Sequence, residues 1–471
     1  MITITRTKSA ALLLLAGSVG CSQKDYFAQW DDRELADQVA ELSEASSHDV
    51  RNAPPKAYRL SSAKASPEDA GVAWYIDAAI RHNPEVRAAR QRVERLRERV
   101  PQATRLPNPM ASVTFGDLAE TAAGQVEYIV GVQQSLPFPG TLDARGEVAR
   151  QEVMEALHGL EVVVDRTMGD TARAYWSHDG ATREIAVLEA NRELLNQIDA
   201  AVRARIRVGQ SGQANLLRVS RELAALDNQL SELERRQTTS AAMLRRLTGF
   251  AVSIGSTATD ASQWATLDVD AEALREQAMR NSPRVAAAQA RMGTYRERLS
   301  LARMERLPDF VLGVQYGAVR DGGLAPSANG DDQIAGTIGV SIPLWAEADN
   351  AGEREALRGI GEALAEAQAA QDSVAFEVEE AVARIEAGQQ TLSRLRDRMM
   401  PDAQQVIDVA LASYRTGGVD LLSLLDDWQV LLMDQMQEAR VLTDLHRAAA
   451  DLTQATGVLL DAEVPQTGDE P

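Results

Sequence analysis

Histidine and cysteine, the side chains that most often bind metals or act as nucleophiles, are few and scattered in this chain of 471 residues. The five histidines are His48, His82, His158, His178 and His446. None has a second histidine four residues away, and no cysteine lies near one, so the spacing of a metal-ligand set is missing. No Walker loop, GxSxG elbow or CxxC pair occurs either. The sequence therefore predicts no catalytic residue, no metal site and no cofactor, and we expect the protein not to be an enzyme.

The single cysteine, Cys21, stands directly after a segment that is typical of an export signal. Arg6 and Lys8 supply positive charge, residues 10–17 are apolar, and small residues occupy positions 18–20. A cysteine in this place resembles the lipobox of bacterial lipoproteins, in which the thiol is acylated, although Ser18 stands where that pattern usually has Leu. We expect residues 1–21 to be a signal peptide and Cys21 to be lipidated. Ordinary cleavage near Cys21 is the alternative.

Charge and composition restrict the classes of partner. The net charge is −20, and no cluster of Lys and Arg with interleaved aromatic residues occurs, so we expect no nucleic-acid partner. Long stretches rich in Ala, Leu, Arg and Glu are typical of extended helices. After Cys21 there is no run of about 18 consecutive apolar residues, which excludes a transmembrane helix. A membrane crossing is then left to strands.

The chain carries a long internal repeat. Its anchors, in pairs, are Pro84 and Pro283, Leu106-Pro107 and Leu307-Pro308, and Gly209 and Gly417. Because distinct anchors keep their order in both halves, chance similarity between Ala-rich helices is the weaker explanation. We expect two structural repeats at 67–262 and 263–460, preceded by a polar extension at 22–66 and followed by a disordered tail at 461–471.

Each repeat predicts a short helix followed by two strands. The helix begins at Pro84 or Pro283, because proline is tolerated in the first turn, and it ends at the Leu-Pro step. The predicted strands are Met110 to Ala119, Val126 to Leu136, Asp309 to Val319 and Gln333 to Ile342. In the second strand of each pair, apolar residues alternate with small or polar ones, and the length of about ten residues suits a transmembrane β-strand. A soluble antiparallel sheet is the alternative that periodicity leaves open.

Two helical hairpins complete the repeats. Residues 144–208 and 353–415 are predicted as helices of roughly 95 Å each at 1.5 Å per residue, and Pro401 should kink the second. The chain then reverses at Gly209 or Gly417 into a helix with apolar residues at heptad spacing. These seams are Leu216, Val219, Leu223, Leu226, Leu230 and Leu233 in the first half, and Leu421, Leu424, Trp428, Leu431, Leu442 and Leu445 in the second.

Four strands are too few to close a barrel, and an open edge in lipid would leave backbone groups without hydrogen bonds. Three copies supply twelve strands, which enclose a water-filled lumen, whereas the eight strands of two copies would be filled by side chains. The expected fold is therefore mainly α with a membrane β part. In it, a homotrimer forms a long α-helical barrel that continues a 12-stranded β-barrel.

The hairpin tips and one proline-rich turn carry a family resemblance. The segments Arg205 to Asn215 and Tyr414 to Asp427, with Gln-Ser-Leu-Pro-Phe-Pro-Gly at 134–140, resemble the TolC family of outer-membrane efflux proteins. The resemblance covers residues 70–460, and the lipobox-like start is similar to the branch that serves heavy-metal RND pumps. It implies a passive duct, anchored in outer-membrane lipid and extending into the periplasm. Its partners would be a periplasmic adaptor protein and an inner-membrane RND-type pump that supplies the energy.

The resemblance also implies roles for single residues. The adaptor-docking tips would be Arg207, Val208, Gly209, Arg415, Thr416 and Gly417, and the periplasmic gate would comprise Asn215, Tyr414, Ser423, Asp426 and Asp427. The family often has acids six and nine positions after the second tip glycine. Here these positions hold Ser423 and Asp426, so one acid is missing. Spacing alone suggests that Tyr414, Arg415 or Arg207 pairs with Asp426 or Asp427 to hold a closed state. Plain helix C-caps and a solvated acidic helix face are the simpler readings of the same residues.

We expect an efflux duct for metal cations or small toxic molecules, because a ring of Asp426 would favour cations. The alternative is a soluble, lipid-anchored periplasmic coiled-coil adaptor or scaffold. The four strands and the duplication argue against it, because an adaptor needs soluble β domains and no barrel.

Overall fold

In the computed structural model, the described residues are 71–249 (except 117 and 119) and 270–456 (except 325, 326 and 328), and all of them belong to one compact unit, Ala53–Pro471. The predictions for Cys21, for residues 1–66 and for the tail at 461–471 lie outside them. The first repeat contains α2 (Val72–His82), α3 (Pro84–Arg97), α4 (Arg99–Ala103), β1 (Met110–Phe115), β2 (Glu120–Thr121), β3 (Gly124–Leu136), α5 (Thr141–Arg207) and α6 (Gln213–Thr248). The second contains α7 (Ala271–Asn281), α8 (Pro283–Met304), β4 (Phe310–Val319), β5 (Gln333–Val340), α9 (Ala346–Arg394), the π-helical turn η3 (Leu395–Met399), α10 (Met400–Thr416) and α11 (Leu421–Thr456).

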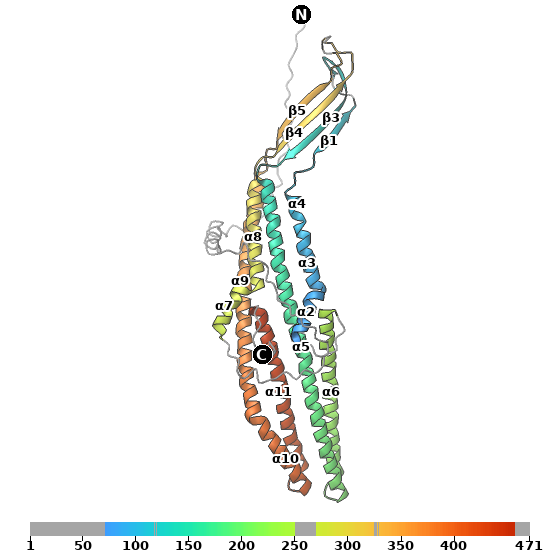
Figure 1. Cartoon of the computed structure of the whole chain (residues 1–471), viewed down its shortest axis with the longest axis vertical. Helices are drawn as coiled ribbons and strands as arrows, with labels where there is room; N and C mark the ends of the chain where they lie inside the picture. Colours follow the sequence, from blue (N-terminus) through green and yellow to red (C-terminus); the bar gives the residue numbers. More distant parts are fainter. Residues whose placement is uncertain are drawn as a thin grey trace, which may run out of the picture. The chain divides into compact units, whose positions relative to one another are not determined.

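The duplication predicted from the sequence is confirmed by this order of elements. Pro84 and Pro283 occupy the first turn of α3 and α8, as expected from their fixed φ and missing N–H. Asn83 caps α3, because its side-chain oxygen accepts a hydrogen bond of 2.7 Å from the backbone N–H of Glu85. In each repeat the strands lie at one end of the unit and the hairpin tip at the other (Figure 1).

The four predicted strands form one antiparallel sheet in the order β1-β3-β4-β5, with the short β2 beside β3. β1 ends at Phe115 and not at Ala119, because the chain turns at Gly116, whose φ of 140° few other residues adopt. β5 ends at Val340, before the predicted Ile342.

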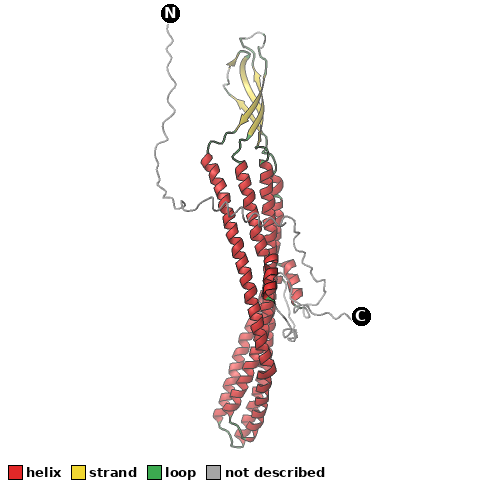
Figure 2. Cartoon of the chain, turned by 90° about the vertical axis from the view of Figure 1, so that its left-hand side faces the viewer, coloured by secondary structure: helices red, strands yellow, loops and turns green. Residues whose placement is uncertain are grey.

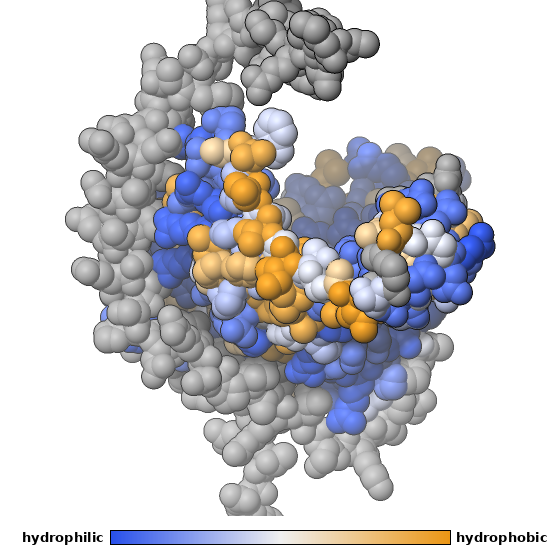
Figure 3. Space-filling model, turned by 90° about the horizontal axis from the view of Figure 1, so that it is seen from above, coloured by the Kyte–Doolittle hydropathy of each residue, from blue (hydrophilic) through white to orange (hydrophobic). Residues whose placement is uncertain are grey.

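The two faces of this sheet differ in chemistry. Val132 lies opposite Val314, and Leu312 opposite Ile338, so these residues share one face. Val314 and Ile338 are 61% and 80% exposed. The other face carries mostly small or polar residues, among them Ser112, Gly131, Gln133, Gln315 and Thr337, with Met110, Ile129 and Val311 as apolar exceptions. Viewed from the strand end, apolar residues gather in a band, drawn orange in Figure 3. An exposed apolar face of this kind is what lipid would cover.

The long helices match the prediction, with one informative difference between the repeats. α5 runs for 67 residues without a break, about 100 Å at the standard rise. The equivalent helix of the second repeat begins at Ala346, earlier than the predicted Glu353, and is interrupted by η3 just before Pro401. A proline ring clashes with the carbonyl four residues back, here Asp397, and a π-turn relieves such a clash by displacing that carbonyl. The predicted irregularity at Pro401 is therefore confirmed.

The predicted heptad seams form the core of the hairpins. Val219, Leu226 and Leu233 of α6 are buried, and so are Leu421, Leu424, Trp428 and Leu431 of α11, all in one cluster with Leu195 and Ile198 of α5. The paired helices of the two hairpins lie side by side in both views (Figures 1 and 2). Within residues 71–249 and 270–456, no helix is both long and apolar enough to cross a bilayer.

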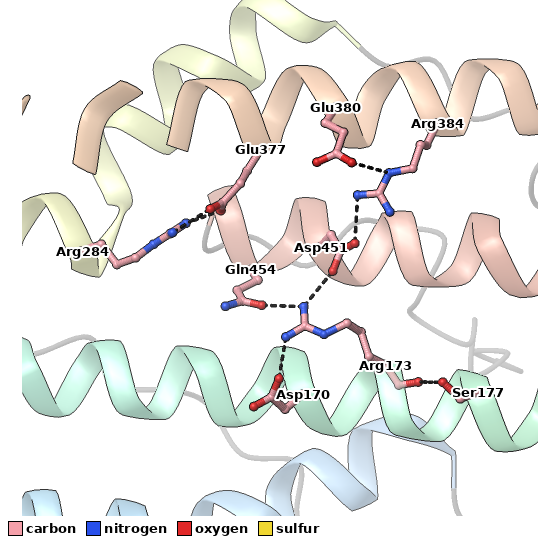
Figure 4. A network of polar contacts seen from close by, with 9 residues as sticks. All are labelled: Asp170, Arg173, Ser177, Arg284, Glu377, Glu380, Arg384, Asp451 and Gln454. Atoms are coloured by element: carbon pink, nitrogen blue, oxygen red, sulfur yellow. Dashed lines mark hydrogen bonds and ion pairs between the residues drawn. The ribbon is translucent and has the colours of Figure 1, made fainter. Parts of the chain in front are cut away.

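Polar contacts fix the long helices against one another where the halves meet. Arg173 of α5 donates hydrogen bonds to Asp451 at 2.7 Å and to Gln454 at 2.8 Å, both on α11. Asp451 also accepts a hydrogen bond from Arg384 of α9 at 3.0 Å. Figure 4 shows these contacts together with the pair formed by Arg284 of α8 and Glu377 of α9. Because each side chain reaches a different helix, the network sets the relative height of α5, α9 and α11.

Candidate functional site at the hairpin tips

Both hairpin tips are built on the same backbone motif. Gly209 and Gly417 follow α5 and α10 with φ of 76° and 91°. The N–H of Gly209 donates to the carbonyl of Ile206, and the N–H of Gln210 donates to the carbonyl of Arg205. At the second tip, Gly417 donates to Tyr414 and Gly418 to Ser413 in the same pattern. This is the Schellman motif, which requires a left-handed residue after the helix and so explains both glycines.

One contact ties the two tips together. Arg205, in the last turn of α5, places its guanidinium 4.7 Å from the ring centroid of Tyr414 in α10. The same guanidinium donates a hydrogen bond of 2.9 Å to the backbone carbonyl of Tyr414. The Tyr414 ring is 1% exposed, and its hydroxyl has no hydrogen-bond partner among the described residues. Tyr414 therefore contributes its ring face and its carbonyl to the contact, and not its hydroxyl.

A small acidic group opens α11 beside the second tip. The carboxylate of Asp420 accepts a hydrogen bond of 3.0 Å from the backbone N–H of Ser423, which caps the helix. That N–H, the backbone N–H of Leu422, the Ser423 hydroxyl and the charge of Arg218 hold the pKa of Asp420 below its usual range. Asp426 is exposed and Asp427 is half-buried one turn further on. The start of α11 thus carries three acidic side chains within eight residues, and the pKa of the first, Asp420, is lowered.

The structure brings together only some of the residues predicted for the tips and gate. Arg207, Val208, Arg415 and Thr416 are exposed beside the two glycines. In the described part of the chain, neither Arg207 nor Arg415 forms an ion pair with Asp426 or Asp427, so the predicted pairing does not occur within one protomer. Asn215 lies on α6, where its side chain donates to Ser211 at 3.1 Å.

Arg205 is the residue that sequence reasoning missed. It lies in the quoted tip segment, one helical turn before Gly209, while Tyr414 stands three residues before Gly417. That spacing places the arginine in the last turn of the first helix of one hairpin and the aromatic ring in the last turn of the first helix of the other. The sequence therefore indicated that an arginine could stack on Tyr414. Only the packing of α5 near α10 shows that this arginine is Arg205.

A cleft accompanies the linked tips. It measures about 520 Å³ and is lined by Gln197, Ala200, Ala201, Ala204, Arg205, Val208, Gln210 and Arg415. Its lining includes three alanines and two arginines. Val208, which is 67% exposed, is the large apolar side chain at its mouth.

No group of three or more His, Cys, Asp or Glu side chains suited to a metal ion is found among the described residues. The described residues at the tips combine exposed arginines, acidic side chains and one exposed valine.

Comparisons with known proteins agree with this fold. The pyoverdine export outer membrane protein OpmQ of Pseudomonas putida is 26% identical over 443 residues, covering 91% of this chain and 87% of that protein. A membrane protein from Pseudomonas aeruginosa superposes with a TM-score of 0.70 at 17% identity, over 86% of this chain and 97% of the other. The outer membrane protein VceC of Vibrio cholerae gives a TM-score of 0.68 at 18% identity, over 82% and 96% of the two chains.

The Outer membrane efflux protein family matches residues 75–250 and 274–458, which are most of both repeats. Members of this family are transport components and not enzymes. The heavy-metal branch is not singled out by any of these matches and stays a prediction. The chain is an outer-membrane channel protein and belongs to the outer membrane efflux protein family.

Proposed function

We propose that three copies of this chain form a passive duct that carries solutes from a periplasmic adaptor and an inner-membrane pump, through the outer membrane, to the exterior. The observation that carries the proposal is the sheet itself: one face is apolar and exposed, and among the described residues its edge strands, β1 and β5, have no further strand beside them. Unpaired edges in lipid cost several kcal/mol per backbone group, so each edge has to pair with another copy. The helices below the sheet extend the duct into the periplasm.

In this proposal the hairpin tips receive the adaptor. The residues in contact would be Arg207, Val208, Gly209, Arg415, Thr416 and Gly417, beside the cleft whose lining includes Ala200, Ala201 and Ala204. Cys21 would carry the lipid anchor, and residues 67–262 and 263–460 would be the two repeats of the duct. An alternative role as a soluble adaptor is not favoured, because the sheet leaves an apolar face open.

The cargo we propose first is a small organic molecule, with metal cations as the second candidate. A relative of 26% identity is named as a pyoverdine exporter. The polar face of the strands, which would line the lumen, carries Ser112, Gln133, Gln315 and Thr337 and is uncharged at these positions. An uncharged lining suits molecules of mixed charge. The carboxylates at the start of α11 are the feature that favours cations.

The experiment compares cells with and without the gene for this chain. If the cargo is an organic molecule of the siderophore type, cells without the gene should release less of it into the medium and accumulate it inside. Their tolerance of Cu²⁺ and Zn²⁺ should stay unchanged. Loss of metal tolerance with normal export of organic molecules would select the second candidate. If neither quantity changes, and the protein is present in the outer membrane, the proposed function is wrong.

A prediction on ion selectivity tests the mouth. Replacing Asp420, Asp426 and Asp427 together by Asn should lower the ratio of cation to anion permeability of the trimer in planar bilayers, because three copies lose nine carboxylates from a narrow entrance. Asn also caps helices, so Asp420→Asn removes charge while keeping the start of α11. An unchanged ratio would mean that these acids lie on an ordinary solvated helix face.

A further inference from the structure

The sheet and the helices beneath it share one lateral order. The strands follow the order β1-β3-β4-β5. The helices joined to them contact one another in the order α3-α5-α8-α9. α4 leads into β1 and β5 leads into α9, each through a few residues. The free edges of the sheet and of the helical layer therefore lie on the same two sides, and pairing of β5 with β1 of a second copy brings α9 beside α3 of that copy.

α9 presents an exposed seam on the side away from its neighbours in the described part of the chain. Val374, Val378 and Ile385 are buried against the protomer, whereas Phe376 is 63% exposed. Exposed alanines continue the Phe376 side at heptad spacing, namely Ala365, Ala369, Ala383 and Ala387. A helix with apolar seams on two opposite sides packs between two neighbours. Asp372 lies one turn before Phe376 on the same side, is exposed, and has no ion pair in the described chain.

The free side of α3 offers complementary charge. Val86 and Val93 are buried toward α5. Arg87 and Arg95 project from the other side, are exposed, and form no ion pair in the described part of the chain. Both arginines are therefore available to an acidic side chain of a neighbouring copy.

Charged contacts that cross the layer fix which residues stand at one height. Glu85 of α3 pairs with Arg166 of α5, the charge of Asp165 acts on Arg284 of α8, and Arg284 pairs with Glu377 of α9. Residues 85 and 377 thus lie at similar levels, to within the reach of these side chains. Arg87 and Asp372 both lie slightly nearer the sheet, about 3 Å and 7 Å from that level at 1.5 Å per residue. Rotation about the axis of a closed ring keeps each residue at its own height.

We propose that α9 of each copy packs along α3 of the next, with Asp372 paired to Arg87 of the neighbouring copy and Phe376 covering the stem of that arginine. This inference rests on the proposed trimer and names the contact that closes its helical wall. The second copy is favoured as the occupant because the contact continues the pairing of β5 with β1 and matches an unpaired acid with an unpaired arginine. Arginine over an aromatic ring adds a further attraction.

The test is a charge exchange in the full-length trimer. Arg87→Glu alone or Asp372→Arg alone places like charges at every contact between copies, and each should lower the dissociation temperature of the detergent-purified trimer by roughly 5 °C or more. The double variant restores opposite charges at every contact of the ring and should recover most of that loss. Arg92→Gln is the control, because Arg92 is an exposed arginine of α3 that borders a cleft over α5, and losing its charge should leave the temperature nearly unchanged.

A second measurement reads proximity directly. Oxidation of the Arg87→Cys, Asp372→Cys double variant should give covalent dimers and trimers on a denaturing gel, and neither single variant should. A double charge variant that is no more stable than its parents, with no cross-linked species, overturns this contact. If the wild type is still trimeric and conducts, the proposed function stands. A wild type that never forms a trimer overturns both.

Discussion

Replacing Val314 by Arg should abolish assembly of the channel in the outer membrane. Val314 lies mid-strand in β4, between Val132 and Gly336 on the apolar face, and is 61% exposed in the protomer. An arginine on the lipid face near the bilayer midplane costs about 2 to 4 kcal/mol, and a trimer carries that cost three times. We expect no heat-resistant trimer of this variant in outer-membrane fractions.

The neighbouring residue provides the control. Gln315 is next in the same strand and points to the other face, opposite Gly131 and Ala335. Gln315→Arg should therefore assemble like the wild type, because its charge enters the water-filled lumen. Its effect should appear only as reduced passage of cations. Equal loss of trimer in both variants would show that the faces are not lipid and lumen, and would favour a soluble sheet.

Replacing Arg205 by Ala should open the periplasmic mouth. The guanidinium loses its stacking on Tyr414 and its hydrogen bond to the Tyr414 carbonyl. Contacts of this kind contribute about 1 to 2 kcal/mol, and 1.4 kcal/mol corresponds to a tenfold shift in an equilibrium, here between linked and separated tips. Because each of three copies holds one link, we expect a clear rise in the fraction of time that the reconstituted trimer conducts.

Three further variants separate this link from its rivals. Tyr414→Phe keeps the ring and the carbonyl, so conductance should stay at the wild-type level. Tyr414→Ala removes the ring and should behave like Arg205→Ala. Arg415→Ala should have little effect, since Arg415 makes no ion pair with Asp426 or Asp427 in the described chain. If Arg415→Ala raised the conducting fraction and Arg205→Ala did not, the data would instead support the pairing of Arg415 with Asp426 or Asp427.

Much of the fold was predictable because its determinants are local. Proline in the first turn, alternation in the strands and heptad spacing at Val219 and Leu226 each act within a few residues. The predicted ends of the elements were less accurate for the same reason. β1 ends at the turn of Gly116, and α9 begins seven residues before Glu353. Neither limit is encoded by hydrophobic periodicity.

The contacts at the tips were not predictable in the same way. Arg205 and Tyr414 are separated by a whole repeat, and their meeting depends on how α5 packs near α10. From the sequence alone, Arg207 and Arg415 were equally good candidates for a contact that links the tips. The roles of Cys21 and of the gate residues Asn215, Ser423, Asp426 and Asp427 remain predictions, because they depend on lipidation or on neighbouring copies that one chain does not contain.

Electron cryo-microscopy of the protein in lipid nanodiscs would show whether three copies form one duct. We predict three copies around one continuous lumen, with β5 of each copy hydrogen-bonded to β1 of the next and Val132 and Val314 facing lipid. A single copy that closes β1 on its own β5 outside the lipid disc would contradict the account.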